Sequence, residues 1–359
     1  EIYREADEEF NINSPKQLGI ILFEKMDFPV IKKTKTGYST SADVLEKLRG
    51  KGEIIDKILD YRKFSKLKST YIDGLKAVIN KKTNRIHSRF MQTVTATGRI
   101  SSIDPNLQNI PIKTEEGRLI RKAFLASEGA SLVDADYSQI ELRVLAALSD
   151  DKEMLEAFKK GLDIHRKTAS EVFHVDYDDV NSLQRSEAKA VNFGIVYGIS
   201  DYGLSQNLNI PRKDAKEYID NYLAHFVGIK NYMAEEIKRG KEDGYVETIF
   251  KRRRYIPELN AKNFNIRSFG ERIALNTPIQ GSAADIIKIS MVKVYNELKK
   301  RNMKSRLIIQ IHDELVVDAV EDEVEEVKKI MRELMENSVD LNVKLSVDMN
   351  TGKNLYESK

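Results

Sequence analysis

The sequence has no cysteine among its 359 residues. This absence excludes a disulfide framework and a thiolate nucleophile, so any metal ion must be held by oxygen or imidazole ligands. Long apolar runs are also missing, because no stretch approaches the roughly 20 consecutive apolar residues of a membrane helix. The chain does not open with a cleavable signal sequence. We therefore expect no membrane partner and a cytoplasmic location.

A strong charge of either sign is missing as well. The chain has 59 Lys and Arg against 56 Asp and Glu, and a net charge of +3 says nothing about partners. A basic run at 251–254 and an acid-rich run at 321–333 are, taken alone, more often solvated surface. The hydrophobic content of 41% is enough for a core. The first residue is Glu1 rather than Met, and we interpret the chain as a fragment or processed piece.

The predicted elements change in kind along the chain. Helical patterning fills the first 85 residues, where Ser14 is a candidate N-cap and Pro15 a candidate first helical residue. A polar stretch at 95–111 is long enough to be functional or disordered. The sequence then predicts a strand at 130–137 running into a helix, mainly helices at 152–276 with a strand-like break at 245–250, a helix at 281–300, a hairpin at 307–320, a helix from 322 and a strand at 345–349. This order is typical of an α+β fold with a helical insertion in a sheet domain.

Adjacent carboxylates interrupt two Ile- and Val-rich runs between Leu307 and Val320. The pattern predicts a β-hairpin whose apolar strands would fix Asp313 and Glu314 at its tip, although such a tip alone is more often an ordinary polar turn. Asp136 also ends a short apolar strand. Two carboxylates at strand ends of one sheet suit Mg²⁺, which prefers oxygen ligands and leaves positions for water and phosphate. Two such ions about 3.5–4 Å apart can stabilise an in-line phosphoryl transfer.

Arg185, Lys189, Phe193 and Tyr197 recur at intervals of four. On a helix they would form one stripe about 18 Å long, with cations at one end and aromatic rings at the other. A nucleoside triphosphate has the same polarity, because its phosphates pair with Arg and Lys while its sugar and base pack on rings. The alternative is a core helix with buried rings and solvated cations, and the stripe alone does not separate the two interpretations.

Three long motifs resemble those of a known family. DYSQIELR at 136–143, RSEAKAVNFGIVYG at 185–198 and QIHDE at 310–314 are similar to motifs A, B and C of the family A DNA polymerases, the bacterial DNA polymerase I type. TATGRISS, DPNLQNIP and NTPIQGSAADIIK fit as well, so the resemblance covers nearly the whole chain. It implies an α+β right-hand architecture: an N-terminally truncated thumb at 1–92, an antiparallel-sheet palm at 93–149 and 260–359, and helical fingers at 150–259.

The resemblance also implies a chemistry, the template-directed addition of dNTPs to a primer 3′-hydroxyl. Asp136 and Asp313 would hold two Mg²⁺ ions with help from the Tyr137 carbonyl, and Glu314 would be secondary. Lys189 would contact the triphosphate and is a candidate proton donor to the pyrophosphate leaving group. The expected partners are primer-template DNA and dNTPs, and the expected state is a monomer.

Further positions take their roles from the same resemblance. Glu141 matches a steric gate against a ribose 2′-hydroxyl, whereas its spacing alone favours a surface glutamate. Tyr197 would lie beside the templating base. The remaining expected nucleotide contacts are Gln139, His165, Arg185 and Phe193, and the expected DNA contacts are Arg99, Asn276, Gln280 and His312. Without the resemblance, His165 would be interpreted as a polar contact at a helix start. Donors in the minor groove can test base-pair geometry because the acceptors there are nearly independent of sequence.

Two alternative functions stay open. The first is a single-subunit RNA polymerase of the same superfamily, against which Glu141 and the whole DYSQIELR string argue. The second is a DNA-binding or clamp protein with a degenerate catalytic site, against which the intact acids and cations of the motifs argue. Leu355 stands where many relatives carry Trp, which concerns local packing. We expect no proofreading by this chain, since residues 1–85 show only scattered surface-type acids.

Overall fold

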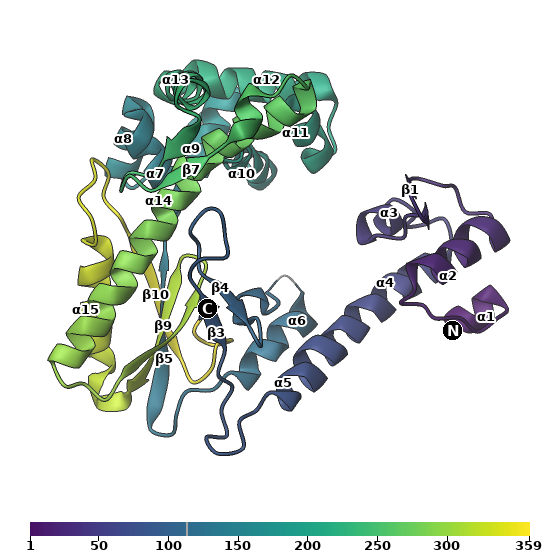
Figure 1. Ribbon diagram of the computed structural model, residues 1–359, viewed down its shortest axis with the longest axis horizontal. Helices are drawn as coiled ribbons and strands as arrows, with labels where there is room; N and C mark the ends of the chain where they lie inside the picture. Colours follow the sequence, from purple (N-terminus) through teal and green to yellow (C-terminus); the bar gives the residue numbers. More distant parts are fainter. Residues whose placement is uncertain (113) are drawn as a thin grey trace. The chain divides into compact units, whose positions relative to one another are not determined.

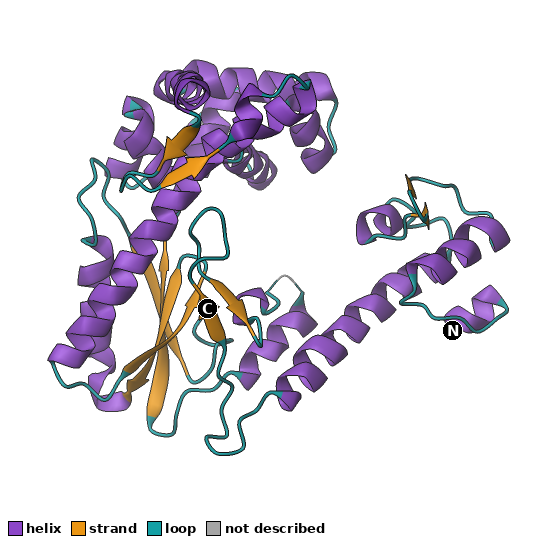
Figure 2. Cartoon of the chain, in the orientation of Figure 1, coloured by secondary structure: helices purple, strands orange, loops and turns teal. Residues whose placement is uncertain are grey.

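The computed structural model describes residues 1–112 and 114–359. The chain divides into two compact units, Glu1–Arg89 and Phe90–Lys359. Helices occur throughout both units (Figure 1), and the longer strands lie in the second (Figure 2). The helices are α1 (Ile2–Ala6), α2 (Pro15–Ile20), α3 (Ala42–Glu46), α4 (Glu53–Lys66), α5 (Gly74–Ala77), α6 (Glu115–Leu119), α7 (Ile140–Ser149), α8 (Lys152–Lys159), α9 (Ile164–Phe173), α10 (Ser182–Val196), α11 (Asp201–Leu208), α12 (Arg212–His225), α13 (Val227–Asp243), α14 (Phe264–Lys300) and α15 (Val324–Glu336). The strands are β1 (Lys33–Thr34), β2 (Gly37–Tyr38), β3 (Arg89–Met91), β4 (Ser101–Ile103), β5 (Ala130–Tyr137), β6 (Tyr245–Glu247), β7 (Arg253–Tyr255), β8 (Arg306–Ile311), β9 (Glu314–Val320) and β10 (Val347–Gly352).

The first unit is built on a small helical core. The Ser14 side chain caps α2 by accepting a hydrogen bond from the Gln17 backbone N–H, and Pro15 is the first helical residue, as the sequence predicted. Part of the helical patterning predicted for the first 85 residues is present as α4, a π-helical segment and α5 in succession. Buried apolar side chains of α2, α3 and α4 meet in one cluster. Every helix in the described residues of the chain is too short or too polar to cross a membrane.

An antiparallel sheet organises the second unit, with its strands in the spatial order β10, β5, β9 and β8. Successive side chains of a strand point to opposite faces. Val133 and Ala135 of β5 and Val317 of β9 belong to a large core that also contains buried residues of α14 and α15, which lie along this face of the sheet (Figure 1). Asp134 and Asp136 alternate with these apolar residues. The two acids therefore lie on the opposite face.

A second, smaller apolar cluster packs on the opposite face of the sheet. Leu132 of β5 and Val316 of β9 pack there with Leu107, which belongs to the long polar stretch of the sequence, and with Leu355. Leu355 is fully buried in this cluster, so its side chain is part of the local packing. The segment between β4 and β5 thus covers the face of the sheet on which Asp136 lies.

The structure corrects two predicted boundaries and adds a strand. Helix α14 begins at Phe264 rather than near residue 281, and it continues through Pro278. Proline normally breaks a helix because it lacks an N–H. Pro278 and its neighbours Thr277 and Ile279 are buried, and their packing keeps the helix continuous. Strand β10 begins at 347 rather than 345, and the basic run contributes β7, which forms a hairpin with β6.

Candidate active site

One end of the sheet gathers the carboxylates of two motifs. Asp136, next to last in β5, lies opposite Glu314, the first residue of β9. His312 and Asp313 connect β8 to β9, and His312 adopts a left-handed backbone with φ of 50°. The Tyr137 N–H donates to the Asp313 carbonyl at 3.1 Å, which fixes the hairpin tip beside the end of β5. The structure therefore brings Asp136 and Asp313 to the same end of one sheet.

The surroundings of these carboxylates favour a cation. Burial raises the pKa of Asp313 to about 6 against the opposing charge of Arg99, and neighbouring carboxylates add to the rise. Lys359 Nζ lies 3.2 Å from Asp136 Oδ2 and also contacts a carboxylate oxygen of Glu314. The other oxygen of Glu314 is buried without a hydrogen-bond partner among the described residues. Positive charge at this end of the sheet would therefore relieve both the burial and the mutual repulsion of the acids.

The donor set fits a hard divalent cation such as Mg²⁺. The Tyr137 hydroxyl donates to the Met335 carbonyl in the core at 2.6 Å, which leaves the Tyr137 backbone carbonyl as its metal-ligand candidate beside Asp136 and Asp313. Mg²⁺ is commonly held by one or two carboxylates, with waters and substrate phosphates completing its shell. No group of three or more acidic or imidazole side chains in residues 1–112 and 114–359 is arranged to hold a metal by itself. The Lys359 ammonium shows that a cation is accommodated where Asp136 and Glu314 converge.

Glu141 is buried in a polar network and is only 5% exposed. Arg99 Nη2 donates to Glu141 Oε1 at 2.7 Å, and the Tyr197 hydroxyl donates to Oε2 at 3.1 Å. Burial, followed by the negative charge of Glu141, raises the pKa of Tyr197 to about 12, so this hydroxyl keeps its proton. The interpretation of Glu141 as a surface residue is wrong. Three residues from three separate motifs meet at this point.

The predicted stripe lies on α10 and its C-terminal cap. Arg185, Lys189 and Phe193 belong to the helix, and Tyr197 is the C-cap residue. Arg185 Nε donates to Asp163 Oδ2 at 2.7 Å. Lys189 is exposed and forms no ion pair with any residue that the structure describes. Phe193 is only partly buried and Tyr197 is 44% exposed, so the rings of the stripe do not form a closed core.

His165 on α9 faces the same stripe. Its ring centroid lies 5.8 Å from that of Phe193, and its Nδ1 lies 3.1 Å from Asn192 Nδ2. Burial lowers the pKa of His165 to about 4, and the nearby cations of Lys189 and Arg185 contribute although Asp163 opposes them. The imidazole is therefore neutral at neutral pH.

The other predicted contacts are more scattered. Asn276 and Gln280 lie one turn apart on α14, and Asn276 Nδ2 is buried without a hydrogen-bond partner in the described part of the chain. Gln139 is the N-cap residue of α7, with φ of 55°. Burial and then the charge of Arg99 lower the pKa of His312. Among the described residues, no hydrogen bond links Asn276, Gln280 or Gln139 to the carboxylate end of the sheet.

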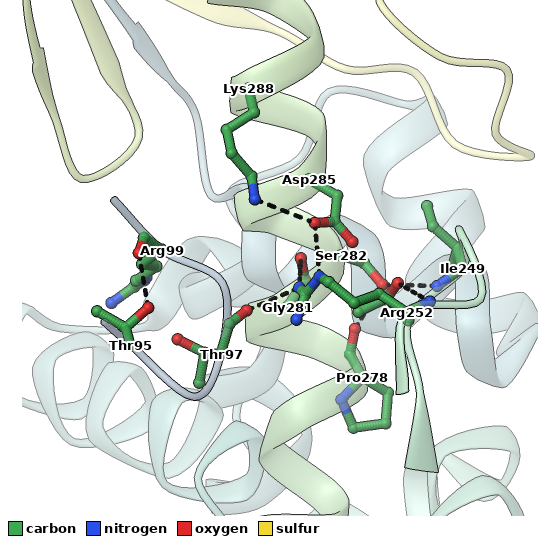
Figure 3. A network of polar contacts seen from close by, with 11 residues as sticks. Thr95, Thr97, Arg99, Ile249, Arg252, Pro278, Gly281, Ser282, Asp285 and Lys288 are labelled. Carbon is green, nitrogen blue, oxygen red and sulfur yellow. Dashed lines mark hydrogen bonds and ion pairs between the residues drawn. The ribbon is translucent and has the colours of Figure 1, made fainter. Parts of the chain in front are cut away.

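The basic run at 251–254 is folded into the second unit through Arg252 (Figure 3). Arg252 Nη2 donates to the carbonyls of Thr97 at 2.7 Å and Gly281 at 3.0 Å, while Nε donates to Asp285 Oδ1 at 3.0 Å. Gly98 has φ of 81°, and a Cβ at this position would lie 2.6 Å from the guanidinium carbon of Arg252. Arg252 therefore ties the TATGRISS segment to α14, and the interpretation of the run as solvated surface is wrong for this residue.

Comparison with known proteins agrees with these motifs. The sequence pattern described as DNA polymerase family A matches residues 1–357. The chain belongs to this family. The resemblance to family A DNA polymerases is thereby confirmed, and the α+β class agrees with the mixture of helices and antiparallel sheet.

Relatives in family A cover most or all of the chain. DNA polymerase I of Bacillus subtilis (strain 168) is 61% identical over 319 residues, which are 89% of this chain and 36% of that protein. DNA polymerase I of Lactococcus lactis subsp. lactis (strain IL1403) is 54% identical over 360 residues, covering 100% of this chain and 41% of that protein. The chain thus spans well under half the length of these curated relatives. The POL domain of Pol1 from M. smegmatis, in complex with DNA primer-template and dNTP, matches with a TM-score of 0.94 and 43% identity over 99% of this chain and 63% of that chain.

Several polar residues of this family A chain were not predicted from the sequence. Lys359 lies beyond the last motif, and its contact with Asp136 has no local signal. Asp134 stands two residues before Asp136 on the same strand face, which strand periodicity could have indicated. It is 3% exposed, neither of its oxygens has a hydrogen-bond partner in the described chain, and burial raises its pKa to about 6. Gln108 donates to Gln310 Oε1 at 3.1 Å, which joins two quoted motifs through residues that had no assigned role.

Proposed function

We propose that this chain carries out template-directed DNA synthesis, adding dNTPs to a primer 3′-hydroxyl by nucleotidyl transfer. The carrying observation is the convergence of Asp136 and Asp313 at one end of the sheet. Glu141 joins this end to Tyr197 at the end of the α10 stripe. The proposal is further supported by relatives named DNA polymerase I and by the M. smegmatis Pol1 structure with DNA primer-template and dNTP.

Two Mg²⁺ ions would be held by the carboxylates of Asp136 and Asp313 and the Tyr137 carbonyl, with Glu314 secondary. When bound, the ions supply positive charge that activates the attacking 3′-hydroxyl and stabilises the leaving oxygen. Asp313 must lose its proton to serve as a ligand, and its pKa of about 6 makes this complete only above neutral pH in the metal-free protein. Lys359 must also release Asp136 and Glu314, because its ammonium occupies carboxylate oxygens that would face the metal ions.

The α9 and α10 residues would orient the triphosphate. Arg185 keeps N–H groups beyond the one that is bonded to Asp163, and Lys189 has its ammonium open to solvent. As the amide of Asn192 is placed, its Nδ2 donates to His165 Nδ1, so the proton of the neutral imidazole is on Nε2 and can be donated to a phosphate oxygen. Lys189 would also give a proton to the departing pyrophosphate.

The sugar and base would be sensed by residues around Glu141. Its carboxylate is held in place by Arg99 and Tyr197, and a fixed group rejects an added 2′-hydroxyl better than a mobile one. Phe193 would face the sugar, and Tyr197 would lie beside the templating base. Gln139 would contact the nucleotide from the start of α7.

DNA would be contacted by Arg99, Asn276, Gln280 and His312. The buried, unpaired Nδ2 of Asn276 is a donor suited to the acceptors of the minor groove. We assign residues 1–92 to a thumb, 93–149 and 260–359 to a palm, and 150–259 to fingers. The proposal places the protein in the cytoplasm as a monomer whose partners are primer-template DNA and dNTPs.

A primer-extension assay tests the proposal. A labelled primer-template is incubated with the protein and either four dNTPs or four rNTPs, with Mg²⁺ or with EDTA. Extension with dNTPs that needs both template and Mg²⁺ is expected. DNA binding without extension would instead indicate a clamp or binding protein. A preference for rNTPs over dNTPs would indicate an RNA polymerase. A 3′-mismatched primer is also incubated with Mg²⁺ and no nucleotides. We expect it to keep its length, since proofreading would shorten it and we expect none by this chain.

A further inference from the structure

A cavity of about 250 Å³ in the second unit is lined almost entirely by cations and an aromatic ring. Its lining residues are Ile112, Arg118, Arg121, Tyr356 and Lys359. Three of these five side chains are positively charged and none is acidic. A cavity of this composition attracts an anion with several oxygens, such as a phosphate group.

Arg121 lines this cavity and carries a buried guanidinium nitrogen without a partner in the described chain. The residue is 4% exposed, and its Nε donates to the Leu355 carbonyl at 3.2 Å. Its Nη2 is buried and has no hydrogen-bond partner among the described residues. The carboxylate of Asp134 attracts Arg121 electrostatically, yet both Asp134 oxygens also lack partners, so the two groups do not satisfy each other. A buried guanidinium nitrogen without an acceptor is unfavourable until a ligand supplies one.

Tyr356 arranges two cations, of which one lines the cavity. The Arg118 guanidinium carbon lies 5.3 Å from the Tyr356 ring centroid, and Lys122 Nζ lies 4.8 Å from the same centroid. Both side chains are exposed, but only Arg118 lines the cavity. The chain thus offers a matched pair of cations with the same aromatic neighbour and different access to the cavity.

Lys359 connects the cavity to the carboxylate end of the sheet. It lines the cavity and places its Nζ 3.2 Å from Asp136 Oδ2. A nucleic acid strand whose 3′ end lies at Asp136 carries one phosphate charge per about 3.4 Å of its axis. Phosphates close behind that end therefore fall within reach of groups that adjoin Asp136.

We propose that this cavity binds one backbone phosphate of the primer strand, a few nucleotides behind its 3′ end, through Arg118, Arg121 and Lys359. The inference rests on the proposed function for the position of the 3′ end. The site would hold the strand in register with the carboxylates, because phosphate contacts fix position without reading sequence.

The test compares Arg118→Gln with Lys122→Gln. Affinity for primer-template DNA is measured by fluorescence anisotropy across a range of salt, with EDTA and without nucleotides, so that no catalysis is needed. Arg118→Gln should weaken binding about threefold to tenfold and reduce the slope of log Kd against log salt by about one. Lys122→Gln, which removes the same charge, should change Kd less than twofold. Equal effects of the two substitutions would overturn the proposal.

Primers in which one phosphate linkage is made neutral can show which primer phosphate occupies the cavity. Primers that each carry one methylphosphonate should reveal one linkage near the 3′ end at which the wild-type protein loses affinity. Because Arg121 and Lys359 remain, Arg118→Gln should reduce, without abolishing, the loss of affinity at that linkage, and it should not change the effect of neutralising the other linkages. Loss spread evenly over all linkages would contradict a single phosphate site.

Competition with inorganic pyrophosphate separates a strand phosphate from a free one. If Arg118→Gln weakens pyrophosphate binding while DNA affinity stays unchanged, the cavity takes the free anion and the primer-strand assignment is wrong. The proposed function has a separate readout in primer extension. An inactive protein that still shows the Arg118-dependent linkage would refute the function and keep the phosphate site.

Discussion

The buried carboxylate of Asp134 allows a prediction about the metal-free protein. Asp134 lies two residues before Asp136, is 3% exposed, and has no hydrogen-bond partner for either oxygen among the described residues. Burial raises its pKa from 3.8 to about 6, against the attraction of Lys359 and with a further rise from Asp136. The substitution Asp134→Asn keeps the shape of the side chain and removes its charge.

The sign of the effect follows from proton binding. Because the folded-state pKa of Asp134 is above the unfolded value, the folded protein binds more protons than the unfolded chain between pH 3.8 and about 6. The free energy of unfolding therefore falls as pH rises through this window. A difference of roughly two pKa units amounts to about 3 kcal/mol in total, of which about 2 kcal/mol lies between pH 4.5 and 7.5. The asparagine variant loses this dependence.

Urea denaturation followed by circular dichroism, with EDTA at pH 4.5 and 7.5, measures the effect. The free energy of unfolding of Asp134→Asn minus that of the wild type should increase by about 2 kcal/mol from the lower to the higher pH. Asp318→Asn is the contrast on the neighbouring strand. The Asp318 carboxylate accepts hydrogen bonds from the Ser127 N–H and hydroxyl, so this substitution should lower the free energy of unfolding at pH 7.5. A difference for Asp134→Asn that does not change with pH would refute the reasoning.

Three other substitutions test the proposed nucleotide site and the Arg252 network. Glu141→Ala should raise kcat/KM for rNTPs relative to dNTPs by about tenfold to a hundredfold, since it opens space for the 2′-hydroxyl; an unchanged ratio rejects the gate. Phe193→Tyr should relax discrimination against dideoxynucleotides by about 1–3 kcal/mol, or roughly tenfold to a hundredfold in the ratio of kcat/KM values, because its hydroxyl replaces the missing 3′-hydroxyl. If that ratio does not move, Phe193 does not face the sugar. Arg252→Lys should lower the free energy of unfolding by about 1–3 kcal/mol in urea denaturation, because one ammonium cannot serve two carbonyls and a carboxylate together. Arg253→Lys at an exposed ion pair is its control, and equal losses would contradict the network.

The parts of the fold that the sequence predicted are those with local signals. Alternating or continuous apolar residues bounded by polar ones identified β5 and the hairpin of β8 and β9, and the side chain of Ser14 identified the start of α2. The spacing of four placed Arg185, Lys189 and Phe193 on one helix without any tertiary information. Such patterns reflect the periodicity of the backbone itself.

The parts that could not be predicted depend on contacts between distant segments. Helix α14 passes through Pro278 because the surrounding core is packed, and a local rule places a break there. Arg252 was one of four cations in a row, and nothing in the run distinguishes the one that reaches Thr97 and Gly281. Lys359 meets Asp136 across 223 positions of sequence, a separation at which neither periodicity nor spacing carries information.

The most direct measurement of the central claim is single-turnover primer extension by Asp136→Ala and Asp313→Ala, with binding of primer-template DNA measured in parallel. Asp322→Ala, an exposed acid beyond the opposite end of β9, is the control and should extend normally. The account predicts that each of the two variants loses at least about a hundredfold in extension rate, because the carboxylates hold the metal ions that stabilise the transition state. The Kd of each variant for DNA should change by only a few fold, because phosphate contacts elsewhere hold the duplex. Extension by either variant at close to the wild-type rate would contradict it.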